Sequence, residues 1–303
     1  MKRTLILLSL FAVPGILTSC KEEPDPPQLV FKSISFSDSR SPEERKKAYE
    51  DGYEGKIVDL HDPKIRNLLN DYYNGACSAG HMDIVLQCLE NGADPGRGLL
   101  YAALGGHMNI VQLMLDKGAT DYDRALARAA EGGHMDIVQL MLDKGADPNW
   151  GIARAAEGGH MDIVQLMLDK GATDYNKGLS GAASGGHMDI VQLMLKKGAD
   201  PNWGIEPAAE HGHLDIVQLM LDKGAGPYWG LCRAAMGGHP EIVKLLLAHP
   251  GIDVNKQDPN GITPLDLAER NGKNSECAEL IRAAGGKQGE ELNIERIRAT
   301  MKK

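Results

Sequence analysis

Apolar residues recur along most of this chain at the spacing of one helix face. In the segment 161–170, four apolar residues lie three and four positions apart, as they do on the buried side of an amphipathic helix. They are Ile163, Val164, Leu166 and Met167. Asp162 in the first turn and Lys170 in the last suit the helix dipole, and Gly171 suits a left-handed C-terminal cap. The pattern predicts one helix that ends at Gly171.

A second, shorter helix is predicted over residues 152–157, and it ends at the paired glycines Gly158 and Gly159. The same two-helix pattern returns at a fixed period, which is marked by a histidine after each glycine. These histidines, 26 or 27 residues apart, are His81, His107, His134, His160, His187, His213 and His239. Such a period is typical of a stacked-repeat protein, in which no unit can bury its apolar face alone.

The unit resembles an ankyrin repeat: Ala-Ala-x-x-Gly-His precedes an Ile-Val-x-Leu-Leu-type helix, and Lys-Gly-Ala-Asp-Pro-Asn follows it. The resemblance covers roughly residues 71–286 and gives eight units, seven short and one full. The last unit is the most complete, with Thr263-Pro264-Leu265 and with Lys273 at the place of the next histidine. The resemblance implies an all-α helical repeat solenoid that binds other proteins.

The short units lack about seven residues that form a projecting β-hairpin in this family. After Asn149 the next helix begins almost at once, at Trp150, and the usual Thr-Pro-Leu-His start is absent. Only the segment 255–263, with Asp258-Pro259-Asn260-Gly261 as its turn, is predicted to form a hairpin. We therefore expect a solenoid in which most of the β-hairpins are deleted, and binding through hairpin tips is not expected.

The amino-terminal region has the layout of a bacterial lipoprotein signal. A short basic start precedes an apolar stretch over residues 4–17, which is too short to span a bilayer as a helix. It ends in Leu17-Thr18-Ser19-Cys20, which resembles the site where a lipid is attached to the cysteine. We expect a signal peptide over 1–19, a lipidated Cys20 and an exported protein held at a membrane. The favoured location is the outer membrane, with the protein facing the periplasm. An ordinary cleaved signal with a chance cysteine is the alternative.

The regions that flank the array are predicted to tether and cap it. Residues 20–40 are charged and proline-rich, as a stiff solvated tether would be. Residues 41–70 begin with Ser41-Pro42-Glu43-Glu44, a good helix start, and are interpreted as an amino-terminal capping region. Asp62-Pro63 is a second candidate helix start there. Residues 287–303 place Ile294, Ile297 and Met301 on one helix face, so they are predicted to be a capping helix, with a frayed tail as the alternative.

Composition and motifs argue against catalysis and against nucleic acid as a partner. The chain has 303 residues and a formal net charge of −9, whereas nucleic-acid binding needs a basic surface. No nucleophile elbow, His-Glu-x-x-His motif or phosphate-binding glycine loop is present, so we expect no enzyme, no cofactor and no small-molecule substrate. The seven histidines lie a full unit apart, too far to converge on a metal, and the resemblance implies that they tie the loop between the helices. Cys77 and Cys88 are candidates for a disulfide, with two buried thiols as the alternative.

A candidate binding surface follows from the register of the units. The third residue before each histidine forms a row that the resemblance places on the concave face: Ser78, Leu104, Glu131, Glu157, Ser184, Glu210 and Met236. Arginine and aromatic residues, which are enriched at binding hot spots, lie around it: Arg128, Arg154, Arg233, Trp150, Trp203, Trp229, Tyr122, Tyr175 and Tyr228. The aromatic residues could instead seal the short loops between units.

These features predict a non-enzymatic interaction protein, an ankyrin repeat scaffold or adaptor tethered to a bacterial membrane through Cys20. Near-identical units suit an extended or repetitive protein partner. An inhibitor of a periplasmic enzyme, or another protective protein, is one alternative. An effector delivered to a host is another, although a lipid anchor argues against it.

Overall fold

The structure, a computed structural model, describes residues 41–58, 68–270 and 275–301. The chain divides into two compact units, Met1–Ser39 and Arg40–Lys303, and every described residue belongs to the second. The predicted signal peptide, the lipidation site at Cys20, the tether and the helix start at Asp62-Pro63 all lie outside the described residues.

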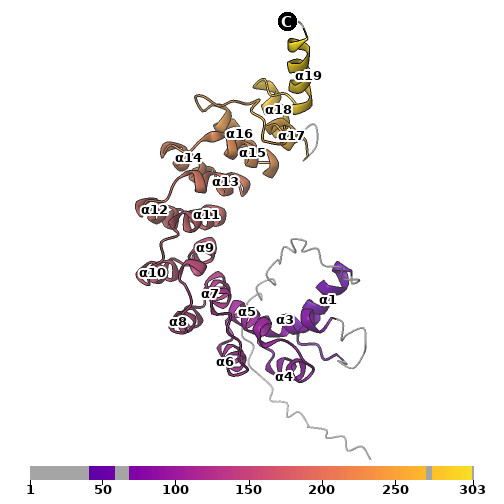
Figure 1. Cartoon of the computed structure of the whole chain (residues 1–303), viewed down its shortest axis with the longest axis vertical. Coiled ribbons are helices and arrows are strands. Elements are labelled where there is room, and N and C mark those ends of the chain that lie inside the picture. Colours follow the sequence, from indigo (N-terminus) through magenta and orange to yellow (C-terminus); the bar gives the residue numbers. More distant parts are fainter. Residues whose placement is uncertain (1–40, 59–67, 271–274, 302–303) are drawn as a thin grey trace, which may run out of the picture. The chain divides into compact units, whose positions relative to one another are not determined.

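Eight pairs of helices follow one another through the described part of the chain (Figure 1). The first helices of the pairs are α3 (Leu69–Ala79), α5 (Pro95–Gly105), α7 (Tyr122–Glu131), α9 (Asn149–Glu157), α11 (Tyr175–Gly185), α13 (Asn202–Glu210), α15 (Pro227–Gly237) and α17 (Pro264–Glu269). The second helices are α4 (Met82–Glu90), α6 (Met108–Asp116), α8 (Met135–Asp143), α10 (Met161–Asp169), α12 (Met188–Lys196), α14 (Leu214–Asp222), α16 (Pro240–Leu247) and α18 (Glu276–Ala283). No strand occurs in this part of the chain, so the predicted all-α repeat fold is confirmed.

The second helices bury the apolar face that the sequence predicted, with one correction. In α10 the side chains of Ile163, Val164 and Met167 are fully buried, but Leu166 is only partly buried. The left-handed glycine at the end of the helix is also present, with φ of 96° at Gly171. The first helix of this unit, α9, has nine residues, as many as α10, so the prediction of a shorter helix was wrong.

The first helices of neighbouring units pack directly on one another, whereas the second helices of neighbouring units make few contacts (Figure 1). Small residues allow this close approach, because Ala155 and Ala156 of α9 and the equivalent alanines of other units are fully buried. The surface of this row of first helices that is turned away from the second helices is the first-helix face.

Each recurring histidine ties its unit to the preceding one. Its Nε2–H donates to a backbone carbonyl near the end of the preceding first helix, at 2.8–3.2 Å. The pairs are His81 with Tyr53, His107 with Ser78, His134 with Leu104, His160 with Glu131, His187 with Glu157, His213 with Ser184 and His239 with Glu210. The sequence predicted a structural histidine that ties the loop between the helices, and the structure shows that its hydrogen bond reaches the preceding unit.

The paired glycines are required by the same contact. Gly106 has φ of 77°, and a Cβ there would lie 2.5 Å from the ring of His134 in the next unit. The glycine before it, Gly105, faces the other way, and a Cβ there would lie 2.0 Å from Ser78 O in the preceding unit. The Gly-Gly-His motif therefore joins three successive units. Its first glycine and its histidine contact the preceding unit, and its second glycine leaves room for the histidine of the next unit.

A second series of hydrogen bonds joins successive units at their loops, where the family's β-hairpins are missing. A side-chain oxygen near the start of one first helix accepts a hydrogen bond from a backbone N–H in the following loop, at 2.8–2.9 Å. The pairs are Asp123 with Asp147, Asn149 with Thr173, Asn176 with Asp200 and Asn202 with Gly226. These bonds satisfy backbone donors that would otherwise rely on solvent.

The predicted hairpin at residues 255–263 forms only its turn. Gly261 N donates to Asp258 O at 2.9 Å and Asp258 N donates to Ile262 O at 3.0 Å, but no strands flank them. Thr263 and Asp266 then form a capping box that begins α17.

Both ends of the described array differ from its interior. Helix α1 (Pro42–Tyr53) begins with the predicted Ser41 capping box and packs on α3. The carbonyl of its last residue, Tyr53, accepts the hydrogen bond from His81, as the carbonyl of a preceding first helix does in the other units. Helix α19 (Gly289–Thr300) forms in the predicted C-terminal segment, but Ile294, Ile297 and Met301 are exposed. Those three side chains therefore do not cover the array as a cap would. None of the described helices is long and apolar enough to cross a membrane.

Candidate interaction surface

Two rows of equivalent residues run along the first-helix face. The entry row, at the start of each first helix, is the third residue after the aspartate or glycine of the preceding loop: Arg97, Arg124, Trp150, Lys177, Trp203 and Trp229. The exit row, at the end of each first helix, is the row predicted from the histidines: Leu104, Glu131, Glu157, Ser184, Glu210 and Met236. All entry-row residues are exposed, whereas exit-row residues are half-buried, apart from the exposed Glu157. Ser78, which continues the exit row, is buried.

The tryptophans are the most conspicuous exposed groups on this face. Trp150, Trp203 and Trp229 are 52%, 51% and 46% exposed, although indole is a large apolar group. The tyrosines behave differently, since Tyr228 is buried and its hydroxyl donates to Lys256 O at 3.2 Å, and Tyr122 and Tyr175 are half-buried. Tyr228 thus packs against a loop and Tyr122 and Tyr175 pack against the core, whereas the tryptophans face solvent.

The predicted arginines pair with the exit-row glutamates. Within one helix, Arg128 contacts Glu131 at 2.9 Å and Arg154 contacts Glu157 at 2.8 Å. Arg233 of α15 reaches back to α13, to Glu206 at 3.3 Å and to Glu210 at 3.7 Å. These pairs are substantially exposed, so they add little to stability, and their charges are accessible to a ligand.

Grooves between neighbouring first helices bring part of the predicted set together. One groove spans α7, α9 and α11 and contains Arg128, Glu131, Trp150 and Arg154. Another spans α11, α13 and α15 and contains Trp203, Glu210 and Arg233. Leu104, Glu157, Ser184, Met236 and Trp229 belong to the same two rows but do not line these grooves.

Several groove residues were missed by the sequence analysis. They are Arg97, which lines a third groove between α5 and α7, and Arg124, Asp147, Asn149, Asp174, Lys177, Ser180, Asn202, Glu206 and Pro207. Seven of the ten lie at or just before the start of a first helix, and Arg97, Arg124 and Lys177 are in register with the tryptophans, so aligning the units on the loop aspartate would have found them. Glu206 and Pro207 are identified only by comparison of one unit with another.

The buried polar groups of the array are structural. Cys77 and Cys88 are free buried thiols, so of the two alternatives that the sequence left open, the buried thiols are confirmed and the disulfide is not. Burial raises the pKa of the Cys88 thiol to about 12, and it raises the pKa of Cys77 as well. Burial lowers the pKa of His107, and the hydrogen bond to Ser78 O opposes this effect. No cluster of metal-ligating side chains occurs within the described ranges.

Models of one protein family match most of the array. A family model of ankyrin repeats in three copies matches residues 74–150 and 205–294, and a model of the single ankyrin repeat matches residues 179–204. Among solved structures, the human ASB11 ankyrin repeat domain is similar at 21% sequence identity and a TM-score of 0.47. That match covers 62% of this chain and 98% of the other. No curated protein matches this chain.

Proposed function

This chain belongs to the ankyrin repeat family, and from that premise we propose that it binds a partner protein through its first-helix face. Ankyrin repeats are protein-interaction scaffolds and are generally non-enzymatic. The observation that carries the choice of face is the entry row, which consists of three half-exposed tryptophans and three basic side chains, most of them lining the grooves. Tryptophan and arginine are the residue types that dominate binding energy at protein interfaces.

The second-helix surface supports this choice by contrast. Its exposed groups include four glutamine and aspartate pairs that bond to each other within one helix, such as Gln165 with Asp169 at 2.8 Å, and its exposed large apolar side chains, in the described second helices, are leucines, Leu86 and Leu214, and no tryptophan. Polar groups satisfied in this way, on an exposed helix surface, offer a partner little apolar area to bury. A partner protein gains more contact area on the first-helix face.

Exchanging the charges of Arg154 and Glu157 is expected to weaken binding of the partner. The variant Arg154→Glu with Glu157→Arg keeps the net charge and keeps an ion pair within α9, but it places like charges opposite the partner. We expect recovery of the partner by affinity purification to fall at least about tenfold, which corresponds to about 1.4 kcal/mol. A single stoichiometric enzyme among the recovered proteins would favour the inhibitor function, and several partners would favour a scaffold.

We also propose that lipid on Cys20 tethers the array to a bacterial membrane. The support is the sequence layout of residues 1–20, in which a basic start and an apolar stretch precede a cysteine, as in a lipoprotein signal. Several acyl chains together hold a protein firmly, because each buried CH₂ contributes about 0.8 kcal/mol.

Substitution of Cys20 by serine is expected to release the protein from membranes. Serine has no thiol to carry the lipid, so the Cys20→Ser chain should appear in the soluble fraction after cell lysis without detergent. The unsubstituted chain should require detergent. If both chains require detergent to the same extent, the tether is not at Cys20.

A further inference from the structure

Two units of the array are nearly identical, and most of their differences lie in one groove. Residues 146–172 and 199–225 differ at four positions only. Three of these lie in α13 or directly after it, where Glu206, Pro207 and His211 replace Ala153, Arg154 and Gly158. Because the buried residues of the two units are the same, these substitutions change the surface of the first helix and not its core.

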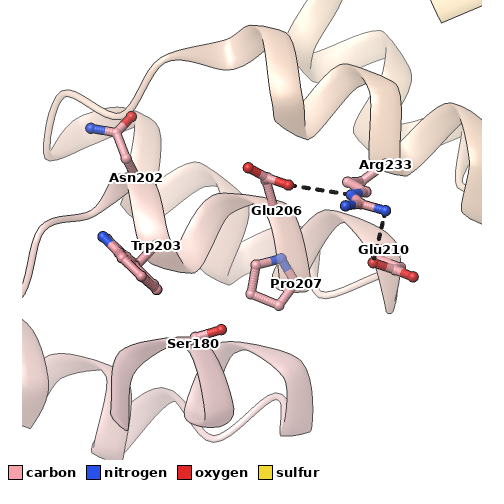
Figure 2. Close-up of a pocket in the computed structure, with 7 residues that line it drawn as sticks. All are labelled: Ser180, Asn202, Trp203, Glu206, Pro207, Glu210 and Arg233. Atoms are coloured by element: carbon pink, nitrogen blue, oxygen red, sulfur yellow. Dashed lines mark hydrogen bonds and ion pairs between the residues drawn. The ribbon is translucent and has the colours of Figure 1, made fainter. Parts of the chain in front are cut away.

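Glu206 and Pro207 line the groove between α11, α13 and α15, which is therefore chemically unlike its counterpart two units earlier. Figure 2 shows Trp203 at one end of this groove and Arg233 with Glu210 at the other, with Pro207 between them and Ser180 of α11 facing them. The groove around Trp150 has four cationic side chains among its lining residues, whereas this one has only Arg233.

The carboxylates of this groove outnumber its cations. Arg233 approaches one oxygen of each carboxylate, Glu206 Oε2 and Glu210 Oε2, so one guanidinium faces two negative charges. In α7 and α9 the corresponding pairs are one arginine to one glutamate. The described residues place no second cation at either carboxylate, and the chain as a whole carries a net charge of −9.

Pro207 adds an acceptor and an apolar wall to the groove. Proline has no backbone N–H, so it cannot donate the helix bond to the carbonyl of Trp203, four residues earlier. A proline in a helix interior costs about 3 kcal/mol relative to alanine, and here it stands where α9 has an arginine. Its ring and the indole of Trp203 form an apolar surface beside the two carboxylates (Figure 2).

We propose that this groove binds a lysine or arginine side chain from a basic segment of the partner protein. The methylene stem of that side chain packs on Trp203 and Pro207, and its charged head bonds to Glu206 and Glu210 beside Arg233. A cation next to the face of an indole gains a further attraction from the ring. This inference rests on the proposed function, since it specifies the chemistry of the partner that the first-helix face binds.

The test uses a hexa-arginine peptide as the probe and tryptophan fluorescence of the full chain as the readout. The variant Glu206→Ala with Pro207→Arg installs the residues that α9 already carries, so the unit remains compatible with the array. The matched control is Asp222→Lys, which changes the net charge by the same +2 and installs the residue that α12 carries at Lys196. We expect the groove variant to bind the probe about tenfold more weakly and the control to change affinity by less than about twofold.

Two outcomes would overturn the proposal. Equal weakening by the groove variant and by Asp222→Lys would mean that the probe responds only to total charge. Absence of binding to the unsubstituted chain would mean that the groove does not accept a basic side chain. Either result would leave the affinity purification with exchanged Arg154 and Glu157 to decide separately whether the first-helix face binds a protein at all.

Discussion

Replacing Gly181 with alanine is expected to destabilise the array by about 3 kcal/mol, as a severe case of overpacking. Gly181 lies inside α11, and a Cβ there would be 2.1 Å from Ala153 O of α9. The obstacle is backbone, which can move away only if α9 and α11 separate. Helix propensity alone predicts the opposite result, because alanine is favoured over glycine by about 1 kcal/mol inside a helix.

Urea unfolding followed by circular dichroism measures this change, with Gly96→Ala as its control. Gly96 lies in the first turn of α5, and the closest atom to a Cβ there is Asp94 Oδ1, at 3.3 Å and on a flexible side chain. We expect that control to stay within about 0.5 kcal/mol of the unsubstituted chain. A Gly181→Ala chain that is as stable as the control would show that the first helices are not in direct contact.

Truncating Met167 to alanine is expected to cost about 2–5 kcal/mol of unfolding free energy, as other large-to-small core changes do. Its side chain is fully buried, and its Sδ lies close to Gly151 of the same unit, where a Cβ would be 3.0 Å away. The substitution leaves a cavity in the core, because the surrounding structure relaxes only partly.

The neighbouring residue Leu166 provides the control for this truncation. It is only partly buried, so Leu166→Ala is expected to cost about 1 kcal/mol, near the average for a point substitution. The same urea titration compares the two variants. Equal losses would mean that α10 does not bury the face that carries Met167.

The hydrophobic period was sufficient to predict the helix pairs, because it reports which face each helix must bury. It was less exact about Leu166, which lies between the buried and the exposed side of α10, where spacing alone does not decide burial. The histidine hydrogen bonds could not be assigned from one unit, since the acceptor lies in the preceding unit, about 29 positions away. The absence of a Cys77–Cys88 disulfide depends on side-chain geometry that spacing does not specify.

The candidate surface was predicted only where the resemblance supplied a register. The exit row was found because the histidines mark it, and the tryptophans because indole is rare in this chain. Arg124 and Lys177 stand in the same register as the tryptophans but look like ordinary solvated charges in the sequence. Pro207 was not recognised because a proline inside a helix reads as a break, whereas α13 continues through it.

The central claim is that a partner protein binds the first helices and leaves the second helices free. Its most direct test compares recovery of the partner by two chains with exchanged charges: Arg154→Glu with Glu157→Arg on α9, and Asp169→Lys with Lys170→Asp at the end of α10. Both keep the net charge and both alter exposed residues. We expect at least a tenfold loss of recovered partner, about 1.4 kcal/mol, for the α9 exchange and less than a twofold change for the α10 exchange. Equal recovery by the two chains, or a greater loss for the α10 exchange, would contradict it.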